Sequence, residues 1–131
     1  MTLRDIRDFI KTLGIGEMVY MGRMDTKKEK SIGVYASKHS NRYKVALGGP
    51  QNASYETKYI TLLVHWNMSP TETEEAAIKL FKAVATTRNV TINNKIIKFA
   101  QPLYELQDVG TDDTGIFEMV IEVAFVCEKE A

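Results

Sequence analysis

The sequence predicts an α+β fold, in which an antiparallel sheet (a meander plus C-terminal strands) carries two helices, at about residues 2–13 and 69–88, on one face. Two observations support this class. Apolar residues recur at helical spacing in those two segments. Elsewhere they alternate or form short β-branched runs between turn residues, and short connections favour antiparallel neighbours. We expect the 131 residues to form a single domain, 1–131.

The first helix has signals at both ends. Thr2 can cap it, with Asp5 three residues later, and Gly14 suits the left-handed position that follows a helix. One face is apolar and consists of Leu3, Ile6, Phe9, Ile10 and Leu13. This short two-faced helix therefore needs a sheet or a partner to cover it.

From Met18 the apolar period changes to two, which predicts strands. Residues 18–24, 31–37 and 43–47 are expected strands of the meander, and residues 25–30 a polar loop. A longer apolar run at about residues 56–66 predicts a central strand that leads directly into the second helix.

Three start signals open the second helix: Ser69 as cap, Pro70 at the first position and Glu72 for a capping box. We place its end at Arg88. The expected apolar arc is Ala77, Ile78, Leu80, Phe81, Val84 and Ala85. Burying each large member contributes roughly 1.5–3 kcal/mol, against about 1 kcal/mol for the cap. The sheet must therefore receive this face.

The C-terminal part reads as β structure. Asn93-Asn94 predicts a tight hairpin between residues 90 and 99, because Asn tolerates positive φ. Residues 103–109 are irregular or a short edge strand, and residues 110–115 form a loop. Residues 117–125 alternate, so this strand has one buried face and one that is wet or covered by a partner.

Composition excludes several classes of protein. Lys+Arg and Asp+Glu are both 17, which argues against a protein that wraps nucleic acid. The single cysteine excludes an internal disulfide and fits a reducing compartment. No apolar run approaches the ~20 residues that span a membrane. We expect synthesis in the cytoplasm and no membrane contact.

No arrangement of residues predicts catalysis, a metal or a cofactor. His39, His65 and Cys127 are the only soft ligands and lie far apart in the sequence, so each is best read as an ordinary loop, strand or buried residue. Asp112-Asp113 resembles a carboxylate pair, but adjacent loop side chains diverge, and a solvated turn is the simpler interpretation. We expect a protein that is not an enzyme.

Lys27, Lys28 and Lys30 form the one basic cluster. It is either a charged loop tip or a weak contact for phosphate or protein, because acidic neighbours dilute it and no stacking aromatics are interleaved. Tyr and Met residues, which are enriched at protein interfaces, are frequent in the predicted meander. We expect half of them to lie in the core and half at an interface. They are Tyr20, Met21, Met24, Tyr35, Tyr43, Tyr55 and Tyr59.

Three segments resemble the minor capsid proteins of long-tailed bacteriophages and prophages, a family similar to the tail terminator group. They are SIGVY at residues 31–35, LLVHWNMSPTETEEAA at 62–77 and DVGTDDTGIFE at 108–118. The resemblance covers nearly the whole chain and rests on structural rather than catalytic motifs. It implies a sheet with two helices on one side.

The resemblance also implies a function in the virion. A six-fold ring of such subunits caps the tail tube, stops its growth and joins tail to head. The implied partners are copies of the chain, the tail tube protein and a head-closure or connector protein, with DNA passing through unrecognised. The alternatives are another neck protein (head closure or connector adaptor) and, less favoured, a small ligand-binding domain.

A closed ring needs two complementary patches on each subunit. Opposite charges on two predicted loops suggest them: Lys27, Lys28 and Lys30 on one, and Asp108, Asp112 and Asp113 on the other. We expect these six residues at the interface with a neighbouring subunit or another partner.

Overall fold

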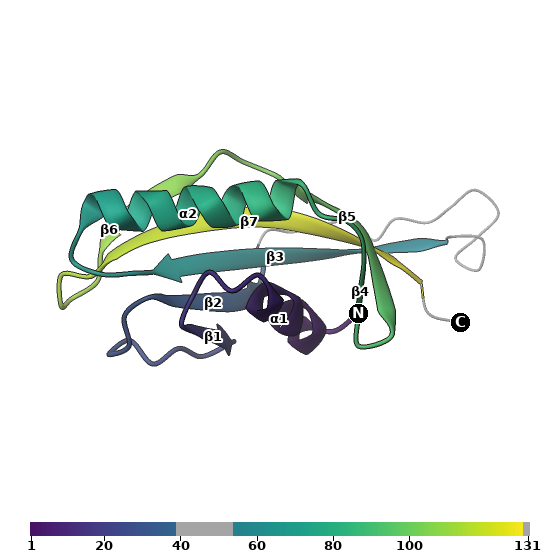
Figure 1. Cartoon of the computed structure of the whole chain (residues 1–131), viewed down its shortest axis with the longest axis horizontal. Coiled ribbons are helices and arrows are strands. Elements are labelled where there is room, and N and C mark those ends of the chain that lie inside the picture. Colours follow the sequence, from purple (N-terminus) through teal and green to yellow (C-terminus); the bar gives the residue numbers. More distant parts are fainter. Residues whose placement is uncertain (39–53, 130–131) are drawn as a thin grey trace.

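The computed structural model describes residues 1–38 and 54–129, and within these ranges it contains two helices and seven strands (Figure 1). In chain order they are α1 (Leu3–Thr12), β1 (Met18–Met21), β2 (Ser31–Ala36), β3 (Tyr55–His65), α2 (Pro70–Ala85), β4 (Arg88–Ile92), β5 (Lys95–Pro102), β6 (Gln107–Thr111) and β7 (Phe117–Glu128). One sheet contains all seven in the order β1-β2-β3-β7-β5-β4, with β6 paired to β7 beside this path. The predicted α+β class is confirmed.

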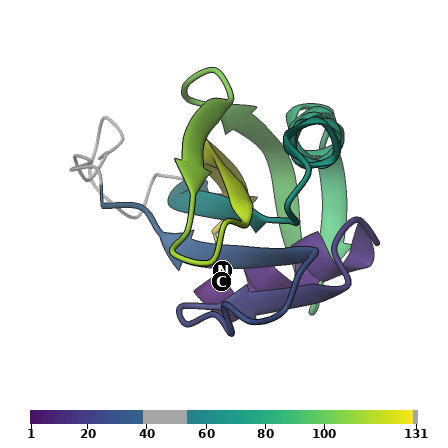
Figure 2. The same ribbon diagram turned by 90° about the vertical axis from the view of Figure 1, so that its left-hand side faces the viewer.

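Both helices pack on one face of the sheet, as predicted, and the sheet curls around them (Figure 2). The register of β3 and β7 places a buried row from each strand side by side: Ile60, Leu62 and Val64 next to Val123, Ile121 and Met119. The helices complete this core with Ile6, Phe9 and Ile10 from α1 and Ala77, Leu80 and Val84 from α2. Burial of these apolar rows is what holds the helices on the sheet.

The start of α1 has the predicted capping box. The Thr2 hydroxyl accepts from the Asp5 N–H, and the Asp5 carboxylate accepts from the Thr2 N–H at 2.8 Å. The same carboxylate also accepts from Lys95 Nζ at 2.8 Å and from Asn93 Nδ2 at 2.9 Å. This cluster, the Asp5 node, ties the start of α1 to the hairpin of β4 and β5. At the other end of the helix, Gly14 has φ +67° as expected.

The second helix ends earlier than predicted. It stops at Ala85, and Arg88 begins β4 instead of closing the helix. The hydroxyls of Thr86 and Thr87 donate to the last helical carbonyls, and Asn89 follows with φ +50°, so the chain leaves the helix here. Arg88 then lies over the Phe99 ring at 5.9 Å from its centroid.

The predicted apolar arc of α2 was also partly wrong. The buried residues are Thr73, Ala76, Ala77, Leu80 and Val84, whereas Ile78 is 37% exposed. The helix is therefore rotated so that Thr73, Ala76 and Ala77 face the core together with the predicted Leu80 and Val84. At the start, Pro70 occupies the first position and the Ser69 hydroxyl accepts from the Glu72 N–H at 3.2 Å, as expected. The predicted capping box is only half formed, because the Ser69 N–H donates to Asn67 Oδ1 at 3.0 Å instead of to Glu72.

The N-terminal strands do not form the predicted antiparallel meander. β1 and β2 are parallel, with Met18 beside Ser31 and Met21 beside Val34, and β1 ends at Met21 rather than residue 24. Gly22 has φ +73° and turns the chain out of the strand, and residues 22–30 then return it to the start of β1. The strand expected at residues 43–47, with His39 and Tyr43, lies outside the described residues.

The C-terminal strands follow the prediction more closely. Asn93 and Asn94 have φ +51° and +64° and form the hairpin turn of β4 and β5. β6 is the edge strand considered for residues 103–109, shifted to include Gly110 and Thr111 of the expected loop. In β7 the predicted buried row is present, but Glu122 and Ala124 on its other face are also buried. The hydroxyls of Ser37 and Thr61 donate to Glu122.

Candidate functional site: the charged end of the sheet

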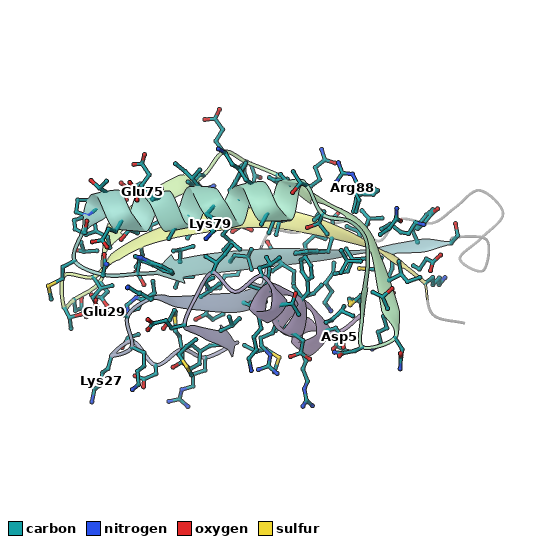
Figure 3. All side chains as sticks on the ribbon, viewed as in Figure 1. Asp5, Lys27, Glu29, Glu75, Lys79 and Arg88 are labelled. Carbon is teal, nitrogen blue, oxygen red and sulfur yellow. The ribbon has the colours of Figure 1, made fainter. Side chains whose placement is uncertain are left out.

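The two loops of opposite charge predicted at an interface lie at the same end of the subunit (Figures 1 and 2). We call this region, residues 22–30, 66–69 and 112–116, the charged end. Lys27 and Lys28 are exposed there and Lys30 is partly buried. Lys27 points outward in Figure 3. Among the described residues, none of the three lysines forms an ion pair.

The acidic loop is shaped by Asp112. Its carboxylate accepts from the Thr114 N–H at 2.9 Å, the Thr114 hydroxyl at 2.8 Å and the Ile116 N–H at 3.0 Å, which closes the turn before β7. Asp113 is exposed beside it. Asp108 lies on β6, exposed, and accepts from the Gly110 N–H across a bulge in the strand. The turn interpretation of Asp112-Asp113 is therefore confirmed.

His65 joins the two loops. Its side chain is fully buried at the end of β3, and both ring nitrogens have partners. Nδ1 lies 2.8 Å from Glu118 Oε2, and Nε2 lies 2.9 Å from the Thr26 carbonyl oxygen in the basic loop. Asp112 Oδ2 is 3.8 Å from the same Nε2. One imidazole therefore contacts the basic loop, the acidic loop and the start of β7.

Backbone hydrogen bonds hold the same end together. The Lys30 N–H donates to the Trp66 carbonyl at 2.7 Å, and the Phe117 N–H donates to the Asn67 carbonyl at 2.9 Å. Met68, in the turn between β3 and α2, is 67% exposed, the most exposed of the large apolar side chains described. Hydrogen bonds thus fix the loops of the charged end, which presents an exposed Met and charges of both signs. These features suit contact with another protein.

Electrostatics at this end follow from these contacts. Partial burial alone would raise the pKa of Asp112, but its hydrogen bonds from Ile116 and Thr114 and the nearby charge of His65 outweigh it and lower the pKa. Burial, and then the negative charge of Glu118, raises the pKa of Tyr35. The turn before β7 therefore favours the charged form of the Asp112 carboxylate.

The sequence did not reveal the partners of His65. The register of β3 and β7 places His65 opposite Glu118, although 53 residues separate them in the chain. No local pattern reports that register, and Thr26 contributes only a backbone oxygen. The Asx turn of Asp112 was the one readable signal, because an Asp side chain in a turn often accepts from the backbone N–H two residues later.

The structure brings no metal or cofactor site to these residues. Within residues 1–38 and 54–129, no group of three or more His, Cys, Asp or Glu side chains is arranged to hold a metal ion. Cys127 lies in the core, where burial raises the pKa of its thiol to about 11. Its Sγ lies 3.7 Å from the Phe125 carbonyl. In the same ranges no helix is long and apolar enough to cross a membrane.

Fold and site together define a class: an α+β protein in which two helices close one face of a curled sheet and charged loops gather at one end. More specifically, the chain belongs to the bacteriophage tail terminator protein family, whose model matches residues 9–129. A comparison with curated proteins gave no match. Family membership gives the chain a structural role in phage tail assembly and makes it a component of the virion.

Proposed function

We propose that this chain forms a ring that caps the finished tail tube, stops tube growth and presents the surface to which the head binds. The observation that carries the proposal is the match to the tail terminator family over residues 9–129, nearly the whole chain. The fold is consistent with this proposal, because the two helices and the sheet bury one apolar core between them. The charged loops lie outside that core and are free to contact other proteins. No catalytic step is needed for this function.

The proposed partners are further copies of the chain in a six-fold ring, the tail tube protein, and a head-closure or connector protein. DNA passes through without specific recognition, since a chain with equal numbers of acidic and basic residues lacks the excess of positive charge that phosphate binding requires. The site of action is the head–tail junction. We propose that residues 1–131 act there as one domain.

The charged end supports a specific contact between neighbours. The lysines lie on one loop, Asp112 and Asp113 lie on the turn beside it, and Asp108 lies on β6, which leads into that turn. Subunits arranged side by side around an axis can therefore place the lysines of one next to the aspartates of the next. We propose that Lys27, Lys28 and Lys30 meet Asp108, Asp112 and Asp113 of the neighbouring subunit in this way. Each exposed pair contributes only about 0.2–1 kcal/mol, so the contact selects register more than it supplies affinity.

Charge reversal tests this contact. Lys27→Glu with Lys28→Glu should weaken ring assembly at low salt, measured as the mass of the particle in solution, and high salt should reduce the difference from wild type. Mixing this variant with Asp113→Lys subunits should restore mixed rings. Lys82→Glu, on the exposed face of α2, is the matched control. Unchanged assembly of the double variant at low salt would remove these residues from the interface.

Electron microscopy of a lysate in which translation of this gene stops early tests the function itself. Overlong tails without heads, beside DNA-filled heads, are the expected result. Tails of normal length beside heads that have lost DNA would move the protein to the head side of the neck. Intact infectious particles would contradict a role in assembly.

A further inference from the structure

The hydrogen-bond geometry around His65 determines how many protons the closed charged end holds. The Thr26 carbonyl oxygen can only accept, so Nε2, at 2.9 Å, carries a hydrogen. Nδ1 and Glu118 Oε2 lie 2.8 Å apart. Without a hydrogen each of these two atoms presents a lone pair, so a proton must lie between them. Whether it is bonded to the ring or to the carboxylate, the pair holds two protons.

If residues 22–30 moved away from His65, the His65–Glu118 pair would hold fewer protons. Exposed to water, a Glu side chain loses its proton at about pH 4.3 and a doubly protonated His at about pH 6.5. Above that pH the open form keeps only one proton: His65 and Glu118 remain neighbours across β3 and β7, and a single hydrogen on Nδ1 satisfies both once Nε2 no longer donates to Thr26. Closing the loop onto His65 therefore takes up one proton from solution, and the closed form loses population as the pH rises.

Other groups around the ring act in the same direction or on Glu118. From the turn before β7, Asp112 Oδ2 lies 3.8 Å from Nε2 and favours a positive ring. From β2, the phenol of Tyr35 senses the charge of Glu118. The basic loop contributes the neutral Thr26 carbonyl. Full burial of the ring keeps water from replacing any of these partners.

We propose that His65 and Glu118 form a proton-dependent latch, in which the second proton of the pair lets Nε2 hold residues 22–30 against the charged end and its loss releases them. Release would free Lys27, Lys28 and the Lys30 N–H from their fixed positions, while the apolar core stays intact. This inference needs only the geometry; its relevance to ring contacts rests on the proposed function.

Amide hydrogen exchange of the full chain, measured by NMR between pH 6 and 9, tests the latch. The protection factor of the Lys30 amide, bonded to the Trp66 carbonyl, should fall above about pH 6.5 by up to about tenfold per pH unit. Amides of the β3–β7 ladder should keep their protection. A Lys30 protection factor that stays constant over this range would overturn the proposal.

Glu118→Gln is the matched variant. Its amide N–H can donate to Nδ1 of a neutral ring while Nε2 still donates to Thr26, so the latch closes without the extra proton. Lys30 protection should then be independent of pH. The same decline in this variant as in wild type would contradict the shared proton. As a second readout, the ring ¹⁵N shifts of wild-type His65 should change together with Lys30 protection; a change in one without the other would also overturn the latch.

Discussion

Replacing Asp5 by Ala should destabilise the protein by about 2–4 kcal/mol. The carboxylate is 5% exposed and accepts four hydrogen bonds, from the Thr2 N–H and hydroxyl, Asn93 Nδ2 and Lys95 Nζ. Losing the cap costs about 1 kcal/mol, and losing a hydrogen bond between charged groups costs about 1.5–3. Lys95 is 26% exposed and can turn to water, which keeps the total below that of a fully buried pair.

The Asp5 prediction also has a pH signature. Burial raises the pKa of Asp5, but the hydrogen bonds from Lys95, Asn93 and Thr2 outweigh it and hold the pKa well below its usual range. A lowered pKa in the folded state stabilises the protein fully above the unfolded value of about 3.9 and progressively less as the pH falls below it. The difference between wild type and Asp5→Ala should therefore shrink from pH 5 to pH 2.

Urea unfolding at each pH measures this difference. Asp8→Ala is the matched control, because Asp8 is one turn later on α1, also accepts from Asn93 Nδ2 at 2.9 Å, and is 29% exposed. It should cost below about 1 kcal/mol. Equal losses for the two variants, or an Asp5→Ala difference that does not change with pH, would refute the assignment of a structural role to the Asp5 node.

Two further predictions concern the core. Leu80→Ala should lower the free energy of unfolding by about 2–5 kcal/mol, because Leu80 is fully buried between α2 and the sheet, whereas Ile78→Ala should cost less than about 1 kcal/mol at its 37% exposure. Equal costs in urea unfolding would show that the helix is rotated as the sequence suggested. Cys127, with its pKa raised to about 11, should react with a thiol reagent at pH 8 roughly a hundredfold more slowly in the native protein than in denaturant; fast native labelling would contradict its burial.

Local signals in the sequence predicted the local structure well. Thr2 with Asp5, Ser69 with Pro70, and Asn93-Asn94 each report the conformation of their own few residues, and all three are found as predicted. The alternation of β7 also reports its buried row. Each of these features depends on residues within about four positions in the chain, so the sequence alone shows all the residues that determine it.

Pairing between distant segments could not be read in the same way. A loop of residues 22–30 fits either an antiparallel turn or the parallel return that places Met18 beside Ser31. The arc of α2 depends on which side chains the sheet accepts, so Ile78 is exposed and Ala76, which was not predicted in the arc, is buried. Lys27, Lys28, Lys30, Asp112 and Asp113 lie in the loops expected for them, and Asp108 lies on β6 instead; the contact of both loops with His65 depends on the register of β3 and β7.

Two of the buried polar clusters, the Asp5 node and the contacts of His65, join different parts of the molecule: Figure 3 shows Asp5 well apart from Lys27 and Glu29 of the loop that His65 contacts. Asp5 bonds to residues 88 and 90 positions away in the chain, and His65 to residues 39 and 53 away. The free energy of apolar burial depends on the buried area and changes little when elements shift slightly. A buried carboxylate or imidazole makes all of its hydrogen bonds in only one arrangement of its partners. The apolar core and the Asp5 node therefore stabilise the fold, and the contacts of His65 set where the loop at the charged end lies. A change at His65 can then move the charged end while the melting temperature hardly changes, so assembly should follow the state of the loop rather than global stability.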